Sequence, residues 1–108
     1  MIGIDITRIS RFKDMADLEH FLTKFNVDGT TPIAAAKTWA CFEALVKAKG
    51  TSFKFSQMRI EFPFNSAPKI IDPDNVLGGK YHLTLSHEDD LVVAVALRIQ
   101  NERWWQRR

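Results

Sequence analysis

The chain has 108 residues, of which 45% are hydrophobic and 26% charged, and its formal net charge at pH 7 is +2. This length predicts a single domain spanning residues 1–108, with a real but modest core. The composition is typical of soluble globular proteins, and no apolar run reaches the ~20 residues of a membrane span. The small net charge does not by itself indicate nucleic acid, and the N-terminus lacks the pattern of a signal peptide. We therefore expect a cytoplasmic protein without a membrane or nucleic-acid partner.

The N-terminal third predicts a strand followed by short helices. Residues 2–6 alternate isoleucine with small or polar residues, which is the two-residue period of a strand with one apolar face. Asp5 lies on the opposite face. Residues 9–25 carry apolar residues at mixed helical spacing, interrupted near Asp17, and predict one broken helix or two short helices. A turn is expected at residues 28–32.

A long helix is predicted from Pro32 to the residue before Gly50. Thr31 is a good N-cap, proline is favoured at the first helical position, and glycine is a good stop. Apolar stripes run along both sides of this helix, so it should be packed on several sides. Only a narrow polar strip remains, with Glu43 and Lys47 about 40° apart around the axis.

The C-terminal half predicts strands. Residues 53–62 alternate largely as a strand that ends at Pro63, and residues 68–71 suggest a short return strand. A loop or a single helical turn is expected over residues 72–79. Residues 82–86 and 91–99 then read as a hairpin. The whole pattern predicts an α+β fold, in which a small antiparallel sheet packs against the long central helix.

Several polar residues allow both a functional and an ordinary interpretation. Glu43 and Lys47 could form a surface ion pair worth ~0.3 to 0.5 kcal/mol, or could share an anionic, metal-bound ligand. Asp5 could cap a turn, or could supply an oxygen ligand to a hard cation such as Mg²⁺. His87 ends a strand, where a structural hydrogen bond is the ordinary role. Cys41 is the only cysteine and is interpreted as a small buried hydrophobe.

Three segments together resemble the 4'-phosphopantetheinyl transferases, specifically the short holo-acyl-carrier-protein synthase type. They are GID at 3–5, WACFEALVKAKG at 39–50, and LSH at 85–87. Each is weak alone, but three in family order within 108 residues form a specific pattern. The resemblance implies Mg²⁺-dependent transfer of 4'-phosphopantetheine from coenzyme A to a serine of an acyl or peptidyl carrier protein, with release of 3',5'-ADP. It also implies an oligomer with active sites between subunits, with a homotrimer as the first choice and a dimer as the second.

The resemblance assigns roles to particular residues. Asp5 and Glu43 would be the metal ligands, and Glu43 would also help to deprotonate the attacking serine. Lys47 would be the second catalytic residue and would stabilise charge on the coenzyme A phosphates and leaving group. The remaining coenzyme A contacts would come from Lys37, Ser86 and His87.

The carrier protein is expected to be acidic and to meet a basic cluster near the N-terminus. Arg8, Arg11 and Lys13 form this cluster, and Arg11 matches a basic position of the family. The ordinary interpretation of the three is the solvated face of a helix. Trp104 and Trp105 are expected at a subunit interface or a core edge.

The chain departs from the family pattern at two positions. Phe42 stands where many members have a lysine before the glutamate, and Thr38 stands where a basic residue often precedes the aromatic residue. Lys37 is the candidate substitute for the second loss. These departures keep an alternative open, namely a weak or inactive relative that binds coenzyme A or a carrier protein as a partner module. A third option is a small α+β interaction protein whose motifs match by chance.

Overall fold

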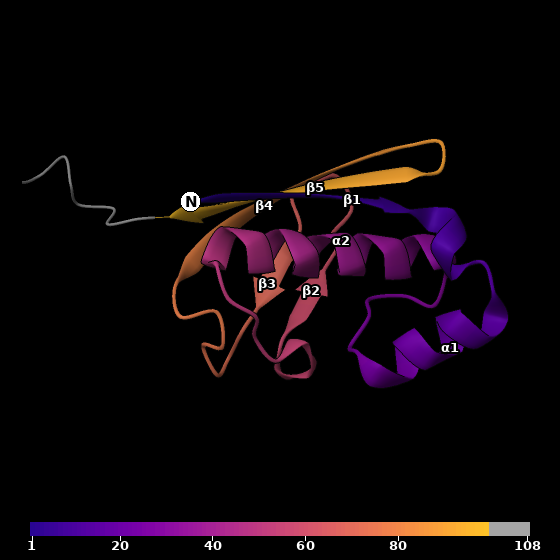
Figure 1. Cartoon of the computed structure of the whole chain (residues 1–108), viewed down its shortest axis with the longest axis horizontal. Helices are drawn as coiled ribbons and strands as arrows, with labels where there is room; N and C mark the ends of the chain where they lie inside the picture. The colour runs from indigo at the N-terminus through magenta and orange to yellow at the C-terminus, as the bar shows by residue number, and fades with distance from the viewer. Residues whose placement is uncertain (100–108) are drawn as a thin grey trace, which may run out of the picture.

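The computed structural model describes residues 1–99 and has an α+β architecture, as the sequence predicts (Figure 1). Strand β1 (Ile2–Arg8) is followed by the 3-10 helix η1 (Ile9–Phe12) and helix α1 (Met15–Lys24). The long helix α2 (Pro32–Lys49) precedes the 3-10 turn η2 (Phe55–Gln57) and two short strands, β2 (Arg59–Glu61) and β3 (Lys69–Ile71). Strands β4 (Lys80–Glu88) and β5 (Leu91–Ile99) complete the described chain. Trp104 and Trp105 lie outside the described residues.

Helix α2 begins and ends where the sequence predicts. The Thr31 hydroxyl accepts a hydrogen bond from the backbone N–H of Ala34 at 3.2 Å, and Pro32 occupies the first turn. Gly50 ends the helix in the left-handed conformation, with φ 88°. Ten residues of α2 are buried, so the helix lies inside the chain. Its lack of a single apolar face follows from this packing on several sides.

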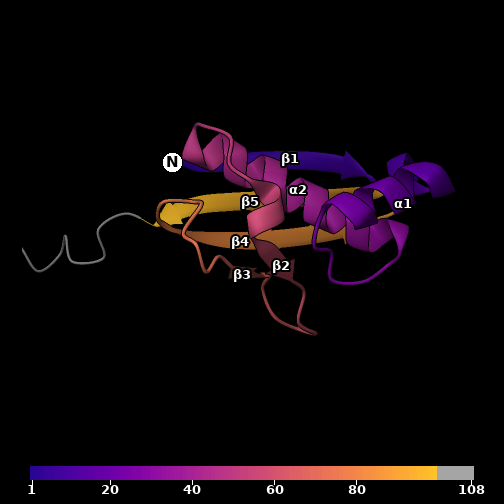
Figure 2. The ribbon, with the colours of Figure 1, turned by 90° about the horizontal axis from the view of Figure 1, so that it is seen from below.

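One face of a three-stranded antiparallel sheet covers α2. The strand order is β1-β5-β4, and Figure 2 shows the three strands side by side along the helix. Gly3 lies at the closest approach of β1 to α2, where an added Cβ would overlap the carbonyl oxygen of Ala44 and lie 2.6 Å from the nitrogen of Ala48. Glycine at this position therefore allows the strand to lie directly on the helix, which places Asp5 beside α2.

The other face of the sheet is apolar and uncovered within the chain. Ile2, Ile4 and Ile6 are 60%, 51% and 62% exposed, although they are the apolar side of the predicted strand. Their cross-strand partners on β5 are Leu97, Val95 and Val93, which continue the surface. The face with Asp5 is the one that packs on α2. We name Ile2, Ile4, Ile6 and Leu97 the outer apolar face.

Two segments differ from the sequence prediction. The break between the first two helices lies at Lys13 and Asp14, because the Asp14 carboxylate caps α1 by accepting from the N–H groups of Ala16 and Asp17. Asp17 itself belongs to the first turn of α1. The predicted strand over 53–62 is wrong for most of its length, since only residues 59–61 pair with another strand. The preceding phenylalanines instead pack into an aromatic cluster beside α2.

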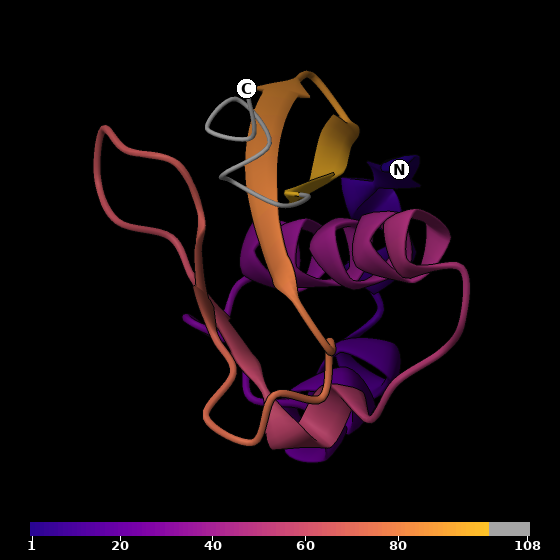
Figure 3. The same ribbon diagram turned by 90° about the vertical axis from the view of Figure 1, so that its left-hand side faces the viewer.

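The remaining C-terminal predictions are confirmed. β2 and β3 form the short antiparallel pair, and β4 and β5 form a hairpin that turns at Asp89 and Asp90, with Asp89 at φ 53°. Residues 72–79 are a loop and contain no helical turn. The connection between β2 and β3 projects beside the β4 edge of the sheet (Figure 3). Among the described helices, none is long and apolar enough to cross a membrane.

Candidate active site

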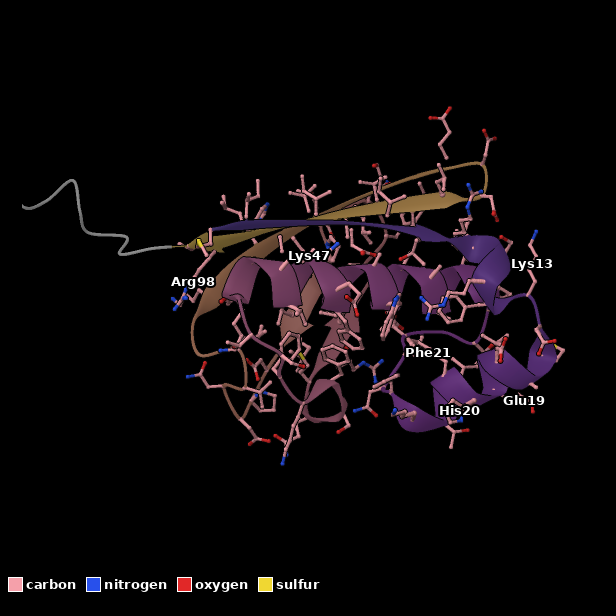
Figure 4. The ribbon with its side chains drawn as sticks, viewed as in Figure 1. Lys13, Glu19, His20, Phe21, Lys47 and Arg98 are labelled. Atoms are coloured by element: carbon pink, nitrogen blue, oxygen red, sulfur yellow. The ribbon has the colours of Figure 1, made fainter. Side chains whose placement is uncertain are left out.

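Asp5 is held at the junction of β1 and α2 by two neighbours. Its Oδ1 accepts a hydrogen bond from the Lys47 ammonium at 3.2 Å, and its Oδ2 accepts one from the Thr7 hydroxyl at 2.7 Å. The ammonium also donates to the carbonyl oxygen of Ile4 at 2.9 Å. Figure 4 shows Lys47 between α2 and β1. Because these contacts fix Asp5 from both sides, its carboxylate has a defined position.

Lys47 pairs with Asp5 and not with Glu43, although the i,i+4 spacing predicts that Glu43 and Lys47 share one strip. The half-buried Glu43 has no ion pair or side-chain hydrogen bond within residues 1–99. It faces a cleft of about 450 Å³, which we name the carboxylate cleft. This cleft is lined by Asp5, Ile6, Thr7, Arg8, Arg11, Trp39 and Glu43. Both predicted metal ligands therefore line one cleft.

The other predicted coenzyme A contacts line a different cleft, of about 670 Å³, between β4 and the β2–β3 connection. Lys37, Ser86 and His87 belong to its wall, and the connection contributes residues 62–68. The Lys37 ammonium lies 5.8 Å from the centre of the Phe62 ring. The His87 Nε2 lies 3.2 Å from the carbonyl oxygen of Asp89. We name this the lysine–histidine cleft.

Helical geometry explains why the two clefts are separate. Lys37 and Glu43 are six residues apart on α2, so their side chains leave the helix about 120° apart. Ser86 and His87 are on β4, whereas Asp5 is on β1, and β5 lies between these two strands. The structure thus brings the predicted site residues together as two groups on different sides of one chain.

The predicted carrier-binding residues surround the end of β1 nearest α1. Arg8 and Arg11 are exposed and line the carboxylate cleft. Lys13 is also exposed but is not part of that lining, because it follows η1 and lies toward α1 (Figure 4). Two of the three basic residues therefore adjoin the predicted metal ligands.

The departures from the family pattern have structural explanations. Phe42 is fully buried and stacks on Phe55, with ring centres 4.7 Å apart. Thr38 is also fully buried, and its hydroxyl donates to the carbonyl oxygen of Ala34 at 2.9 Å. Neither position has room for a solvated lysine, whereas the half-buried Lys37 reaches a cleft.

Cys41 is a core residue, as the sequence predicts. Burial raises the pKa of its thiol to about 12, and the negative charge of Asp5 adds to this effect. The thiolate, which is the nucleophilic form, is therefore scarce at neutral pH.

Sequence reasoning missed Thr7, Trp39 and the β2–β3 connection. The Asp-x-Thr spacing on a strand was an available signal, since residues two apart share a face. The sequence places Trp39 at the start of the helix motif and in an apolar stripe, but neither position predicts that it lines the carboxylate cleft. Nothing in residues 62–68 indicated that this connection forms the wall of a cleft.

The residues of the carboxylate cleft fit a magnesium ion. Mg²⁺ in phosphate-transfer sites commonly binds one or two carboxylates and keeps several waters. Asp5 and Glu43 provide two. Glu43 has no cation within hydrogen-bonding distance in residues 1–99, whereas Asp5 Oδ1 also accepts from the Lys47 ammonium and keeps a second lone pair for a metal. No group of three or more histidine, cysteine, aspartate or glutamate side chains suited to a metal occurs in that range. Water and substrate oxygens would complete the coordination.

Comparison with known proteins identifies the family. No family-wide sequence model matches the chain. A holo-[acyl-carrier-protein] synthase of Aliarcobacter butzleri is 34% identical over 118 aligned positions, which cover 95% of this chain and all of the relative. The chain belongs to the holo-[acyl-carrier-protein] synthase family. A second synthase of this family, from Mycoplasma mobile, is 29% identical over 106 positions, covering 91% of this chain and 88% of the relative.

Solved structures of such synthases share the fold. The Helicobacter pylori holo-[acyl-carrier-protein] synthase, crystallised in complex with coenzyme A, superposes with a TM-score of 0.74. It is 21% identical, and the match covers 92% of this chain and 100% of that chain. The Plasmodium yoelii synthase gives a TM-score of 0.73 at 21% identity, covering 94% of each chain. At 21% identity, the structural similarity shows a shared fold and no more.

Proposed function

We propose that this chain transfers 4'-phosphopantetheine from coenzyme A to a serine of an acyl or peptidyl carrier protein. Membership of the synthase family supports this activity at the level of the reaction. The observation that supports the proposal most strongly in this chain is that Asp5 and Glu43 line the same cleft, together with Arg8 and Arg11. The cytoplasmic location remains a prediction.

Each charged residue would have a defined role. When bound, Mg²⁺ would supply positive charge to the pyrophosphate of coenzyme A. Lys47 holds Asp5 in position through its ammonium contact. Glu43 would accept the proton of the serine hydroxyl, whose oxygen forms the new bond to the β-phosphorus of coenzyme A. The bond from this phosphorus to the bridging oxygen breaks, and 3',5'-ADP leaves with the electron pair.

The active site would be completed by a second copy of the chain. Lys37, Ser86 and His87 lie in a separate cleft, so a single chain does not place them beside Glu43. The outer apolar face offers a surface for association, because contiguous exposed isoleucines are unusual on a monomer. A trimer would bring the lysine–histidine cleft of one subunit to the carboxylate cleft of the next.

The binding-module alternative rests on the absence of a lysine at Phe42. The burial of Phe42 weakens that argument, since this position faces the core and not a ligand. Asp5, Glu43 and Lys47 are all present. We therefore favour the enzyme.

Intact-mass measurement of an apo carrier protein tests the proposal. Incubation with the chain, coenzyme A and Mg²⁺ should add the mass of 4'-phosphopantetheine to the carrier. Glu43→Gln should slow this transfer by ~10² to 10⁴, because it removes a metal ligand and the proton acceptor. The exposed Glu19 lies outside the carboxylate cleft, so Glu19→Gln is the matched control and should retain activity. Near-full turnover by Glu43→Gln at saturating coenzyme A would contradict the assigned role.

A further inference from the structure

Arg11 stands at the boundary between two clefts. It lines the carboxylate cleft, and it also lines a groove of about 630 Å³ between α1, α2 and the segment 52–56. We name this the aromatic groove, because Phe21, Phe25, Phe53 and Phe55 belong to its wall. Trp39 is the other residue that lines both spaces. Arg11 and Trp39 together therefore form the ridge between them.

The Arg11 guanidinium is held by aromatic rings. Its central carbon lies 5.1 Å from the centre of the Trp39 ring and 5.6 Å from that of Phe12. These separations are in the range of cation–π attraction. Within residues 1–99 the guanidinium has no ion pair or hydrogen bond. Its five N–H donors consequently remain available to an anion from outside the chain.

Trp39 is itself fixed from three sides. Its ring centre lies 6.0 Å from Phe21, 6.4 Å from Phe25 and 6.0 Å from Phe55. The three partners come from α1, the end of α1 and η2, so the support comes from different parts of the chain. Figure 4 shows Phe21 between α1 and α2. A ring supported in this way gives Arg11 one preferred place above it.

The charge of the aromatic groove favours an acidic occupant. Its wall contains Arg11, His20, Lys24 and Lys54, and no aspartate or glutamate among the residues described. A carrier segment lying across this groove would place its carboxylates against the basic side chains. The carrier serine would then reach over the ridge into the carboxylate cleft.

We propose that Trp39 is a positioning residue for carrier recognition: its ring holds the Arg11 guanidinium on the ridge, where it donates to a carboxylate of the carrier protein. This inference rests on the proposed function. It concerns how the partner is bound, and it assigns Trp39 no contact with the reacting atoms.

Steady-state kinetics with varied carrier and saturating coenzyme A test the inference. Trp39→Leu should raise the carrier KM about tenfold, since it removes the stacking surface of Arg11, while kcat and the coenzyme A KM stay within about twofold. Trp39→Phe should restore most of the carrier affinity. Arg11→Ala should raise the carrier KM at least as much as Trp39→Leu. The double variant Trp39→Leu/Arg11→Ala should be no worse than Arg11→Ala, because the ring acts through the guanidinium.

A second stacked arginine provides the matched control. Arg98 lies 5.9 Å from the centre of the Tyr81 ring, at the end of the molecule opposite Lys13 (Figure 4). Arg98→Ala should leave the carrier KM unchanged. Arg11→Lys, an exposed change that should not disturb folding, keeps the charge but lacks the planar fork, and it should also weaken carrier binding.

Four outcomes would overturn the inference. The first is additive losses in the double variant. The second is a fall in kcat with an unchanged carrier KM, and the third is wild-type affinity in Arg11→Lys. The fourth is an increase in the coenzyme A KM in place of the carrier KM, which would assign Arg11 to a phosphate. A failure of the proposed function is distinguishable, because the wild-type chain would then transfer nothing at any carrier concentration.

Discussion

Phe42 packs against aromatic side chains of two other segments, the end of α1 and η2. It stacks on Phe55 and lies 5.8 Å from the ring centre of Phe25, and its side chain is fully buried. Phe42→Lys would place an ammonium in this cluster, which is strongly unfavourable unless the long stem reaches water. Truncations of buried phenylalanine typically cost ~3 to 5 kcal/mol, and the charge adds to that cost.

Phe42→Lys should therefore lower the melting temperature without raising turnover. Thermal unfolding followed by circular dichroism, together with the transfer assay, checks both parts. Met15→Lys is the matched control, because Met15 is 65% exposed on α1, lines neither the carboxylate cleft nor the lysine–histidine cleft, and should tolerate the charge. A large gain in coenzyme A affinity for Phe42→Lys would show that this position reaches the ligand.

Residue-level contacts were only partly predictable from the sequence. The role of Phe42 in packing followed from its place about 100° from Glu43 around the helix. The contact of Lys47 with Asp5 was not predictable, because Asp5 is 42 positions away in the sequence and the contact depends on how β1 lies on α2. The i,i+4 spacing predicts that Lys47 pairs with Glu43, whereas the packing of β1 on α2 brings the Asp5 carboxylate to Lys47.

At the scale of elements, the β4–β5 hairpin is tied to the start of η1 through Asp90. Its carboxylate accepts hydrogen bonds from the N–H of Ser10 at 2.9 Å and from the Ser10 hydroxyl at 2.6 Å. The hydrogen bond from the Ser10 hydroxyl is the main cause that lowers the pKa of Asp90 below its ordinary value of 3.8. The hydrogen bonds to the ionised Asp90 therefore stabilise the folded state. This contribution is fully present above the pKa of Asp90 in the unfolded chain, and it is lost as the pH falls through the lower pKa of the folded chain.

Asp90→Asn should accordingly be less stable than the wild type near neutral pH. The difference in melting temperature should shrink as the pH drops below about 3.8 and the wild-type carboxylate becomes protonated. Thermal melts across this pH range measure the difference. Asp89→Asn is a suitable control, since Asn tolerates the left-handed conformation of this turn position and the side chain does not contact Ser10. A difference that stays constant down to the lowest pH would contradict the stabilising role of the Asp90–Ser10 hydrogen bonds.

Elements with strong end signals were predictable, and those without them were not. Thr31, Pro32 and Gly50 define α2, because capping chemistry is local. The segment 53–62 has alternating apolar residues, but these pack as an aromatic cluster beside Trp39 and Phe42. Alternation alone therefore predicted too long a strand, since burial in a cluster can produce the same pattern.

At the scale of the molecule, the outer apolar face has no covering element inside the described chain. The apolar character of the long helix and the pair Trp104 and Trp105 predict apolar surface that is hidden between subunits. Helix α2 is buried within the chain and the tryptophans lie outside residues 1–99. Most of the exposed large apolar side chains of the described chain belong to β1 and β5, with Met1, Met15 and Phe64 as exceptions. Local alternation cannot tell which face of a strand the chain covers, so this surface was not predictable.

Ile4→Asp should dissociate the proposed trimer. Ile4 is 51% exposed in the chain, so the substitution should leave the subunit folded while placing a charge in the interface. Light scattering should give a species near the 12.4 kDa of one chain, and transfer activity should be lost. Met15→Asp is the control, because Met15 is 65% exposed but lies on α1. If the wild type is itself a stable monomer, the trimer and the shared site are both wrong.

The mixing of two inactive variants tests the shared active site most directly. Glu43→Gln impairs the carboxylate cleft and His87→Ala impairs the lysine–histidine cleft, so each variant alone should transfer phosphopantetheine poorly. When the two are co-expressed in equal amounts, random assembly should give about one quarter of the sites both intact clefts, from neighbouring subunits. Carrier modification by intact mass should then recover to about a quarter of the wild-type rate. Recovery no greater than the mean of the two separate variants would contradict the account.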